Sequence, residues 1–156
     1  MEVSGSILRH LCIMCGSLAL LGVLSLSCGT TDPPSTRNSM EGVIDGTDWR
    51  ATERSVTREE NVIELEGVSA IGTTVRLVLR GDTIGTYRLG EGVNHGSVID
   101  LSNTWVTHGT GSGSATITEI DEEHVVGFFG FKGKDTIGLQ APINVTNGKF
   151  DVDFLP

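Results

Sequence analysis

The run Asp-Glu-Glu-His at positions 121–124 is the densest group of potential metal ligands in the chain. Carboxylate oxygens are the ligands that Ca²⁺ prefers, and imidazole nitrogens are common ligands of Zn²⁺. The run lacks the spacing of an EF-hand loop, and alternate residues of a strand point to opposite sides. We therefore expect Asp121, Glu122, Glu123 and His124 to form a solvated acidic hairpin tip, with a metal site as the alternative. No cofactor is expected.

Two further histidines, His95 and His108, are the candidates for acid–base chemistry. Both lie in glycine-rich stretches, which are typical of solvated turns. The sequence contains neither G-x-S-x-G nor H-E-x-x-H. The pattern favours a non-catalytic protein. The alternative is a small hydrolase that uses His95 or His108, because the members of a catalytic triad need not be adjacent in sequence.

Cys28 lies two residues after an uncharged apolar stretch, residues 11–26. This stretch follows Arg9 and His10. A spanning helix needs about 20 apolar residues, so this stretch has the length of a signal peptide's apolar region rather than of an anchor. The boundary Leu-Ser-Leu-Ser-Cys-Gly at 24–29 is similar to a bacterial lipobox, in which the cysteine after the cleavage site is diacylated. We expect residues 1–27 to be a lipoprotein signal peptide and Cys28 to carry the lipid. A plain secretory signal is the alternative.

The remaining cysteines, Cys12 and Cys15, lie inside the apolar stretch and would be removed with it. The mature chain then has one thiol, at its first residue, which rules out a disulfide framework. Residues 29–39 are polar and contain Pro33-Pro34, which is the composition of a linker. We expect residues 28–40 to form the lipidated cysteine and a polar tether, and residues 41–156 to form one domain.

That domain reads as all-β. Apolar residues alternate with polar or charged ones at 62–66 and 149–154, and glycine-rich turns recur about every ten residues. Asn147-Gly148 is the pair typical of a type I′ hairpin turn and predicts one there. Thr57-Arg-Glu-Glu60 also matches a capping box, so a short helix is the alternative at that point. We expect a single antiparallel meander of about 8–10 strands, closed as a β-sandwich or a flattened barrel. The predicted strands are 42–45, 49–58, 61–69, 73–80, 84–89, 97–106, 113–120, 124–132, 137–146 and 149–155.

The strand at 124–132 contains three of the five phenylalanines of the chain and should anchor the core. Period-two spacing places Phe129 and Phe131 on one face and Phe128 on the other. We expect Phe129 and Phe131 to face the same interior as the apolar residues of 150–154.

Charge limits the partners. The chain has a formal net charge of −9 and its 11 basic residues are scattered, which excludes a basic nucleic-acid footprint. We expect a monomer whose membrane contact is made through the lipid on Cys28.

The order of these features resembles a group of small lipoproteins of unknown function that is common in Bacteroidetes and their relatives. The features are the lipobox cysteine, the polar tether, Asp-Gly-Thr-Asp-Trp-Arg-Ala at 45–51, Gly-x-Phe-x-Phe at 127–131, and Val-Thr-Asn-Gly-Lys-Phe-Asp-Val at 145–152. The resemblance implies a compact, membrane-tethered β domain with no assigned chemistry.

Together these observations predict a lipid-anchored protein of the bacterial cell envelope. Its β domain would act as a binding or structural module for a protein, a glycan or a small ligand. The alternative is a lipocalin-like carrier of a small apolar ligand. Trp49 follows an early turn, and a tryptophan in a similar position is typical of lipocalin-like barrels.

Overall fold

The computed structural model describes residues 37–90, 92–109 and 111–154, all of which belong to the unit Asp32–Pro156. The predicted signal peptide, Cys28 and most of the predicted tether lie outside these residues. Within the described part of the chain, no helix is long and apolar enough to cross a membrane.

Ten strands make up the domain, and the described residues contain no helix. The first begins at Ser39, two residues before the predicted domain boundary. The strands are β1 (Ser39–Ile44), β2 (Thr47–Glu59), β3 (Val62–Ser69), β4 (Thr74–Arg80), β5 (Gly85–Leu89), β6 (His95–Asp100), β7 (Asn103–Val106), β8 (Ser112–Ile120), β9 (His124–Asp135) and β10 (Ile143–Asp153).

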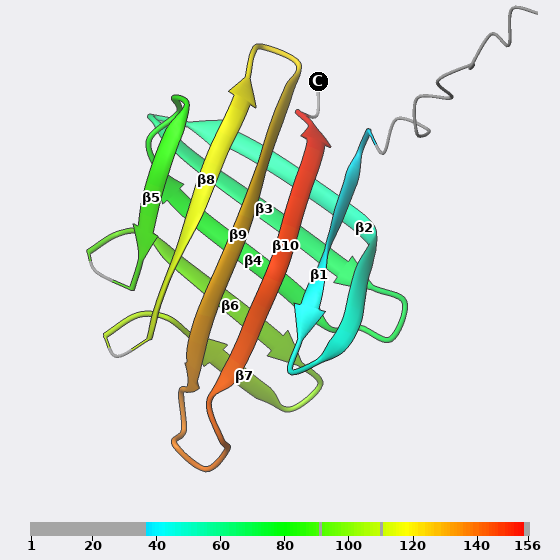
Figure 1. Ribbon diagram of the computed structural model, residues 1–156, viewed down its shortest axis with the longest axis vertical. Helices are drawn as coiled ribbons and strands as arrows, with labels where there is room; N and C mark the ends of the chain where they lie inside the picture. Colours follow the sequence, from blue (N-terminus) through cyan, green and yellow to red (C-terminus); the bar gives the residue numbers. More distant parts are fainter. Residues whose placement is uncertain (1–36, 91, 110, 155–156) are drawn as a thin grey trace, which may run out of the picture. The chain divides into compact units, whose positions relative to one another are not determined.

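The strands form an antiparallel sheet that closes on itself. Its order is β10-β1-β2-β3-β4-β6-β7-β9-β8-β5, and β9 also pairs with β10. The ring β10-β1-β2-β3-β4-β6-β7-β9 is therefore an eight-strand barrel, from which β8 and β5 extend along the first part of β9. In Figure 1 the layer of β5, β8, β9, β10 and β1 crosses the layer of β3, β4, β6 and β7. The predicted all-β class is confirmed, and the strand order departs from a simple meander at β5 and at β8, which both lie outside the ring.

Three predicted strand assignments are wrong. The predicted strand 137–146 begins only at Ile143, because residues 136–142 form the loop between β9 and β10. The predicted strand 97–106 is two strands, because the chain turns at Leu101-Ser102 between β6 and β7. The predicted hairpin at Asn147-Gly148 is a β-bulge inside the continuous strand β10, in which Asn147 has a φ of +52°. A hairpin there would remove the strand that pairs with both β1 and β9, so closure of the barrel overrides the local turn preference.

The capping-box segment is also part of a strand. Residues 57–59 end β2, and Glu60 and Asn61 both have positive φ, +46° and +63°, as a two-residue type I′ hairpin requires. The apolar spacing of β3, with Ile63 and Leu65 fully buried, fits period two rather than a helix.

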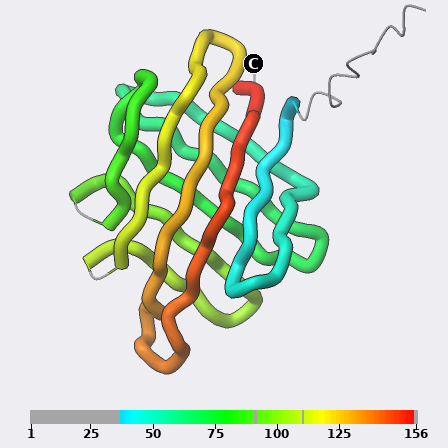
Figure 2. The backbone as a smooth tube through the Cα atoms, viewed as in Figure 1, coloured from blue at the N-terminus to red at the C-terminus, as the bar shows by residue number. Residues whose placement is uncertain are grey.

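The core confirms the predicted facing of the phenylalanines. Phe129, Phe131 and Phe150 are buried, and their rings lie in a row with 6.3 Å between the centroids of neighbours. Val152 is buried with them, and Phe154 packs against the edge of this cluster. The smooth path of β9 and β10 past one another is clear in Figure 2.

Glycines in the barrel wall make room for these large side chains. A Cβ on Gly67 would stand 2.8 Å from both the Met40 sulfur and the Trp49 ring, and one on Gly96 would stand 2.9 Å from the Phe131 ring. The space beside each glycine is thus already occupied by a buried side chain. The indole N–H of Trp49 donates a hydrogen bond of 3.1 Å to the Thr73 carbonyl, which fixes the ring beneath the β3–β4 turn.

Candidate ligand-binding groove

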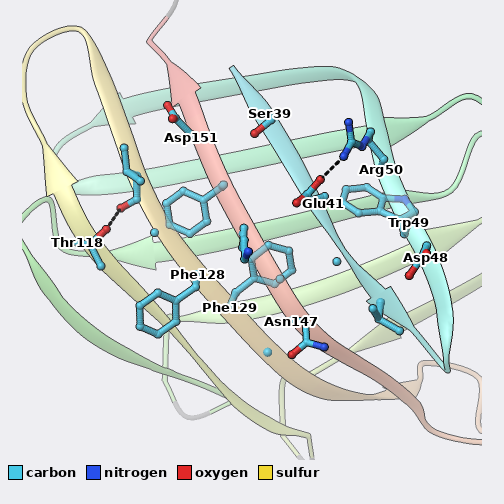
Figure 3. Close-up of a pocket in the computed structure, with 18 of the residues that line it drawn as sticks. Ser39, Glu41, Asp48, Trp49, Arg50, Thr118, Phe128, Phe129, Asn147 and Asp151 are labelled. Atoms are coloured by element: carbon cyan, nitrogen blue, oxygen red, sulfur yellow. Dashed lines mark hydrogen bonds and ion pairs between the residues drawn. The ribbon is translucent and has the colours of Figure 1, made fainter. Parts of the chain in front are cut away.

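A groove with a volume of about 1150 Å³ runs over the outer face of the barrel. Its lining comes from five strands, each paired with the next: β8, β9, β10, β1 and β2 (Figure 3). Trp49, Phe129 and Phe150 also border it, but their side chains are buried in the barrel. The functional surface of the groove is therefore made by side chains that point outward from these five strands.

One row of cross-strand neighbours crosses the groove and ends beside it at Thr116, which is not one of the lining residues. Thr116 of β8 is the partner of Phe128 of β9, and Phe128 is the partner of Lys149 of β10. Lys149 is the partner of Glu41 of β1, which in turn is the partner of Arg50 of β2. Side chains of directly opposed antiparallel residues lie about 4.5–5.5 Å apart at Cβ. Barrel closure thus aligns residues from both ends of the domain in a single line.

Phe128 is the aromatic side chain of this row, and 51% of it is exposed. The strict alternation of β9 puts it on the face opposite to Phe129 and Phe131. Its neighbours in the row, Thr116 and Lys149, are polar, and its neighbours along the outer face of β9 are Val126 and Gly130. The ring is therefore an apolar platform with small or polar residues around it.

The charged side of the groove contains an ion pair and a second cation. Arg50 Nη2 lies 2.6 Å from Glu41 Oε2, and the Arg50 side chain is largely exposed. An exposed ion pair of this kind contributes little to the stability of the fold. It does place the Arg50 and Glu41 side chains next to each other on the surface of the groove. Lys149 has no acidic group within 4.0 Å among the described residues.

The β-bulge adds an amide to the groove. Asn147 lines it and is exposed, because the extra residue of the bulge turns this side chain outward (Figure 3). Asp151 lies further along β10, opposite Ser39 and Val126. Its Oδ1 is shielded from solvent and has no hydrogen-bond partner in the described part of the chain. The groove thus offers amide and ammonium donors together with carboxylate acceptors.

The predicted acidic hairpin tip forms the β8–β9 turn, away from the groove. Asp121 Oδ1 accepts the backbone N–H groups of Glu123 at 2.7 Å and of His124 at 2.8 Å, which lowers the pKa of Asp121. His124 Nδ1 lies 2.9 Å from Asp121 Oδ2, without the alignment of a hydrogen bond. Glu122 instead borders a second hollow of about 330 Å³, beside Arg58. Within residues 37–154 as described, no three or more His, Cys, Asp or Glu side chains are arranged to hold a metal ion.

The two candidate catalytic histidines lie apart from the groove. His95 begins β6, and its Nδ1 lies 3.1 Å from the Val93 carbonyl. His108 is exposed in the loop after β7. Neither imidazole has a carboxylate within 4.0 Å among the residues that the structure describes.

Sequence reasoning found part of the groove. Alternation along β9 already placed Phe128 on the outer face. The row as a whole was missed because it depends on the pairing of β10 with β1, two strands from opposite ends of the domain. Its one local signal was Asn147-Gly148, which indicated a hairpin rather than a bulge.

Comparison with known proteins gives a family but no function. Residues 36–152 match a domain of unknown function, DUF6252. No curated protein and no solved structure matches the chain. The matched residues span all ten strands of the barrel except the last residue of β10, together with the whole groove. The chain belongs to the DUF6252 family.

Proposed function

We propose that this protein is a non-catalytic binding module, tethered to the bacterial cell envelope through a lipid on Cys28, that holds its ligand in the outer groove. The observation that carries the proposal is the row through Phe128, Lys149 and Glu41. These residues stand on neighbouring strands of a closed barrel, so the backbone positions from which their side chains project are set before any ligand arrives. Such preorganisation reduces the entropy cost of binding.

The chemistry of the groove supports binding rather than catalysis. Nucleophilic and acid–base catalysis need a nucleophile within hydrogen-bond reach of a base. In the groove, Glu41 is paired with Arg50, and the hydroxyl of Thr118 donates to the Val126 carbonyl at 3.2 Å. Neither Glu41 nor Thr118 thus has a nucleophile or a base as the partner in these contacts.

The packing of the barrel supports an outer rather than an inner site. A carrier of apolar ligands needs a lined internal cavity of about 300 Å³ or more. Here the rings of Phe129, Phe131 and Phe150 stack along the interior, and wall glycines abut buried side chains. Side chains therefore fill the part of the barrel interior beside these residues, where a carrier would need an open cavity for its ligand.

The start of the domain supports a tether. Arg37, two residues before β1, has its Nε 3.5 Å from Asp153 Oδ1, which joins the start of the described chain to the end of β10. The chain then enters β1, whose Ser39 and Glu41 border the groove. The lipobox-like sequence at 24–29 supplies the anchor in this proposal.

The experiment immobilises the full-length protein and measures its retention of the protein, polysaccharide and lipid fractions of the envelope of the producing cell. Phe128→Ala removes the platform, and Ile84→Ala is the matched control, because Ile84 is equally apolar, 67% exposed, and lies outside the groove. We expect one fraction to be retained by the wild type and by Ile84→Ala but not by Phe128→Ala. Retention of no fraction, or equal retention by all three proteins, would contradict the proposal.

A further inference from the structure

We propose that the ligand of the groove is an uncharged oligosaccharide, which lies across the strands with one sugar ring stacked on Phe128. This inference rests on the proposed function and adds the chemical class of the ligand. A pyranose ring has an apolar C–H face and a rim of hydroxyl groups that both donate and accept hydrogen bonds. The groove has the complementary arrangement.

The apolar part of the groove fits one ring. Phe128 is half exposed, whereas its row neighbours Thr116 and Lys149 end in a hydroxyl and an ammonium group. The apolar residues that share the groove, Val43 and Val126, are small and only partly exposed. A protein partner would need a wider apolar centre surrounded by a polar rim. Here one aromatic ring is flanked by polar side chains. This arrangement matches a glycan, in which the apolar face of each sugar ring is surrounded by hydroxyl groups.

The polar part of the groove suits hydroxyl groups. Lys149 and Asn147 present donors, whereas Glu41 and Asp151 present acceptors. Asp151 brings its carboxylate to the edge of this surface, with Oδ1 turned away from solvent. A hydroxyl uses both kinds of partner, and buried polar groups left without a partner are costly, so the pairing also confers specificity.

The charge of the groove favours a neutral ligand. The two basic side chains, Arg50 and Lys149, face three carboxylates, those of Glu41, Asp48 and Asp151, and the whole chain has a net charge of −9. A polyanionic glycan would approach an anionic protein against its field. The mixed signs within the groove also leave no single-sign patch for an acidic ligand.

The spacing of the row sets the direction of the ligand. Neighbouring strands lie roughly 4.8 Å apart, and the row from Thr116 to Arg50 crosses five of them. Each strand thus advances the row by a distance comparable to the length of a sugar residue in an extended chain. A ligand perpendicular to the strands places successive residues over Phe128, Lys149 and the Glu41–Arg50 pair. Thr116, fixed by a 2.9 Å contact between its Oγ1 and that of Thr86, lies beyond Phe128.

The test is calorimetric titration of the full-length protein in a polyoxyethylene detergent, since a glycoside detergent would compete for the groove. The probes are cellotetraose, xylotetraose, mannotetraose and N-acetylchitotetraose, with tetragalacturonate as the acidic comparison. We expect at least one neutral probe to bind, Phe128→Ala to weaken it by about tenfold or more, and Phe128→Trp and Ile84→Ala to retain it. Binding should change little between low and high salt.

Binding of tetragalacturonate alone, or neutral binding that Phe128→Ala leaves unchanged, would overturn the inference. Absence of binding by every probe would overturn it as well. If Phe128-dependent retention of an envelope protein or lipid fraction persisted in that case, the proposed binding function would stand and only the ligand class would be wrong. Circular dichroism of each variant verifies that the barrel is intact.

Discussion

The ring of Phe129 lies over the backbone of Gly148, so that a Cβ on this glycine would stand 2.6 Å from two atoms of the ring. The two residues face each other across β9 and β10, next to the bulge at Asn147. The bulge lets β10 continue past Phe129 and pair with β1 on its other edge. Closure of the barrel, and with it the position of the groove, therefore depends on how Phe129 packs against Gly148.

Gly148→Ala should destabilise the protein by about 1–3 kcal/mol, because overpacking a filled core forces its neighbours to shift. The Phe129 carbonyl oxygen is also 2.6 Å from the added Cβ, and backbone yields less readily than a side-chain end. Urea denaturation measures the change. Gly130→Ala is the control, since its Cβ would meet only the Val145 carbonyl oxygen, at 3.3 Å. If Asn147-Gly148 formed a hairpin turn away from the core, the steric cost at Gly148 would disappear.

Phe129→Ala and Phe128→Ala should differ widely in stability although the residues are adjacent. Truncating a buried phenylalanine costs about 3–5 kcal/mol, and Phe129 is 4% exposed. Phe128 is 51% exposed, so its truncation should cost less than about 1 kcal/mol. Chemical denaturation of both variants tests the face assignment. Equal losses would place both rings in the core and remove Phe128 from the groove.

Local patterns predicted the strands better than their pairing. The alternation of β9 and of the end of β10 correctly assigned the buried faces, because period two is a property of a single strand. Glu60-Asn61 carries no glycine, yet both residues adopt the positive φ of a hairpin turn, since the registers of β2 and β3 impose it. Asn147-Gly148 has the stronger turn signal and forms none.

The groove depends on relations that no window of sequence contains. Glu41 and Lys149 become neighbours only when β1 pairs with β10, which closes the barrel. By contrast, the acidic run 121–124 is conspicuous in sequence because its members are contiguous, and the structure explains Asp121 as the cap of a turn. The contiguous acidic residues therefore form only a turn. The groove, with its apolar, basic and acidic side chains, is built from five strands that are separate in sequence.

Lowering the pH should loosen the β9–β10 loop. Asp135 accepts backbone N–H groups of Gln140, Ile137 and Leu139, which hold its pKa below the ordinary value of 3.8. A carboxyl whose pKa is lowered by folding stabilises the folded loop above its unfolded pKa. That contribution is lost as the pH falls below 3.8 and through the lowered pKa.

Hydrogen exchange of the Leu139 and Gln140 amides, corrected for the intrinsic pH dependence of exchange, measures this loss. Protection should be constant at neutral pH and fall in the acid range. In Asp135→Ala the protection should be low at every pH, because this side chain has no acceptor for the Leu139 and Gln140 amides, which both donate to Asp135 Oδ2. Protection that persists in the variant would mean that the Trp105 indole, which donates to the Ala141 carbonyl at 3.0 Å, holds the loop by itself.

Two measurements on the protein from the producing cell test the lipidation of Cys28. The first is metabolic labelling with palmitate, and the second is the mass of the N-terminal peptide. The wild type should incorporate the label and begin at Cys28 with an acylated residue, because the apolar stretch 11–26 ends at a lipobox-like boundary. Cys28→Ser removes the sulfur that would be acylated and should abolish both the label and cleavage at this position. Cys15→Ser is the matched control, since Cys15 lies within the apolar stretch and should be removed with it. A labelled Cys28→Ser variant, or a mature N-terminus at another residue, would refute the lipid anchor.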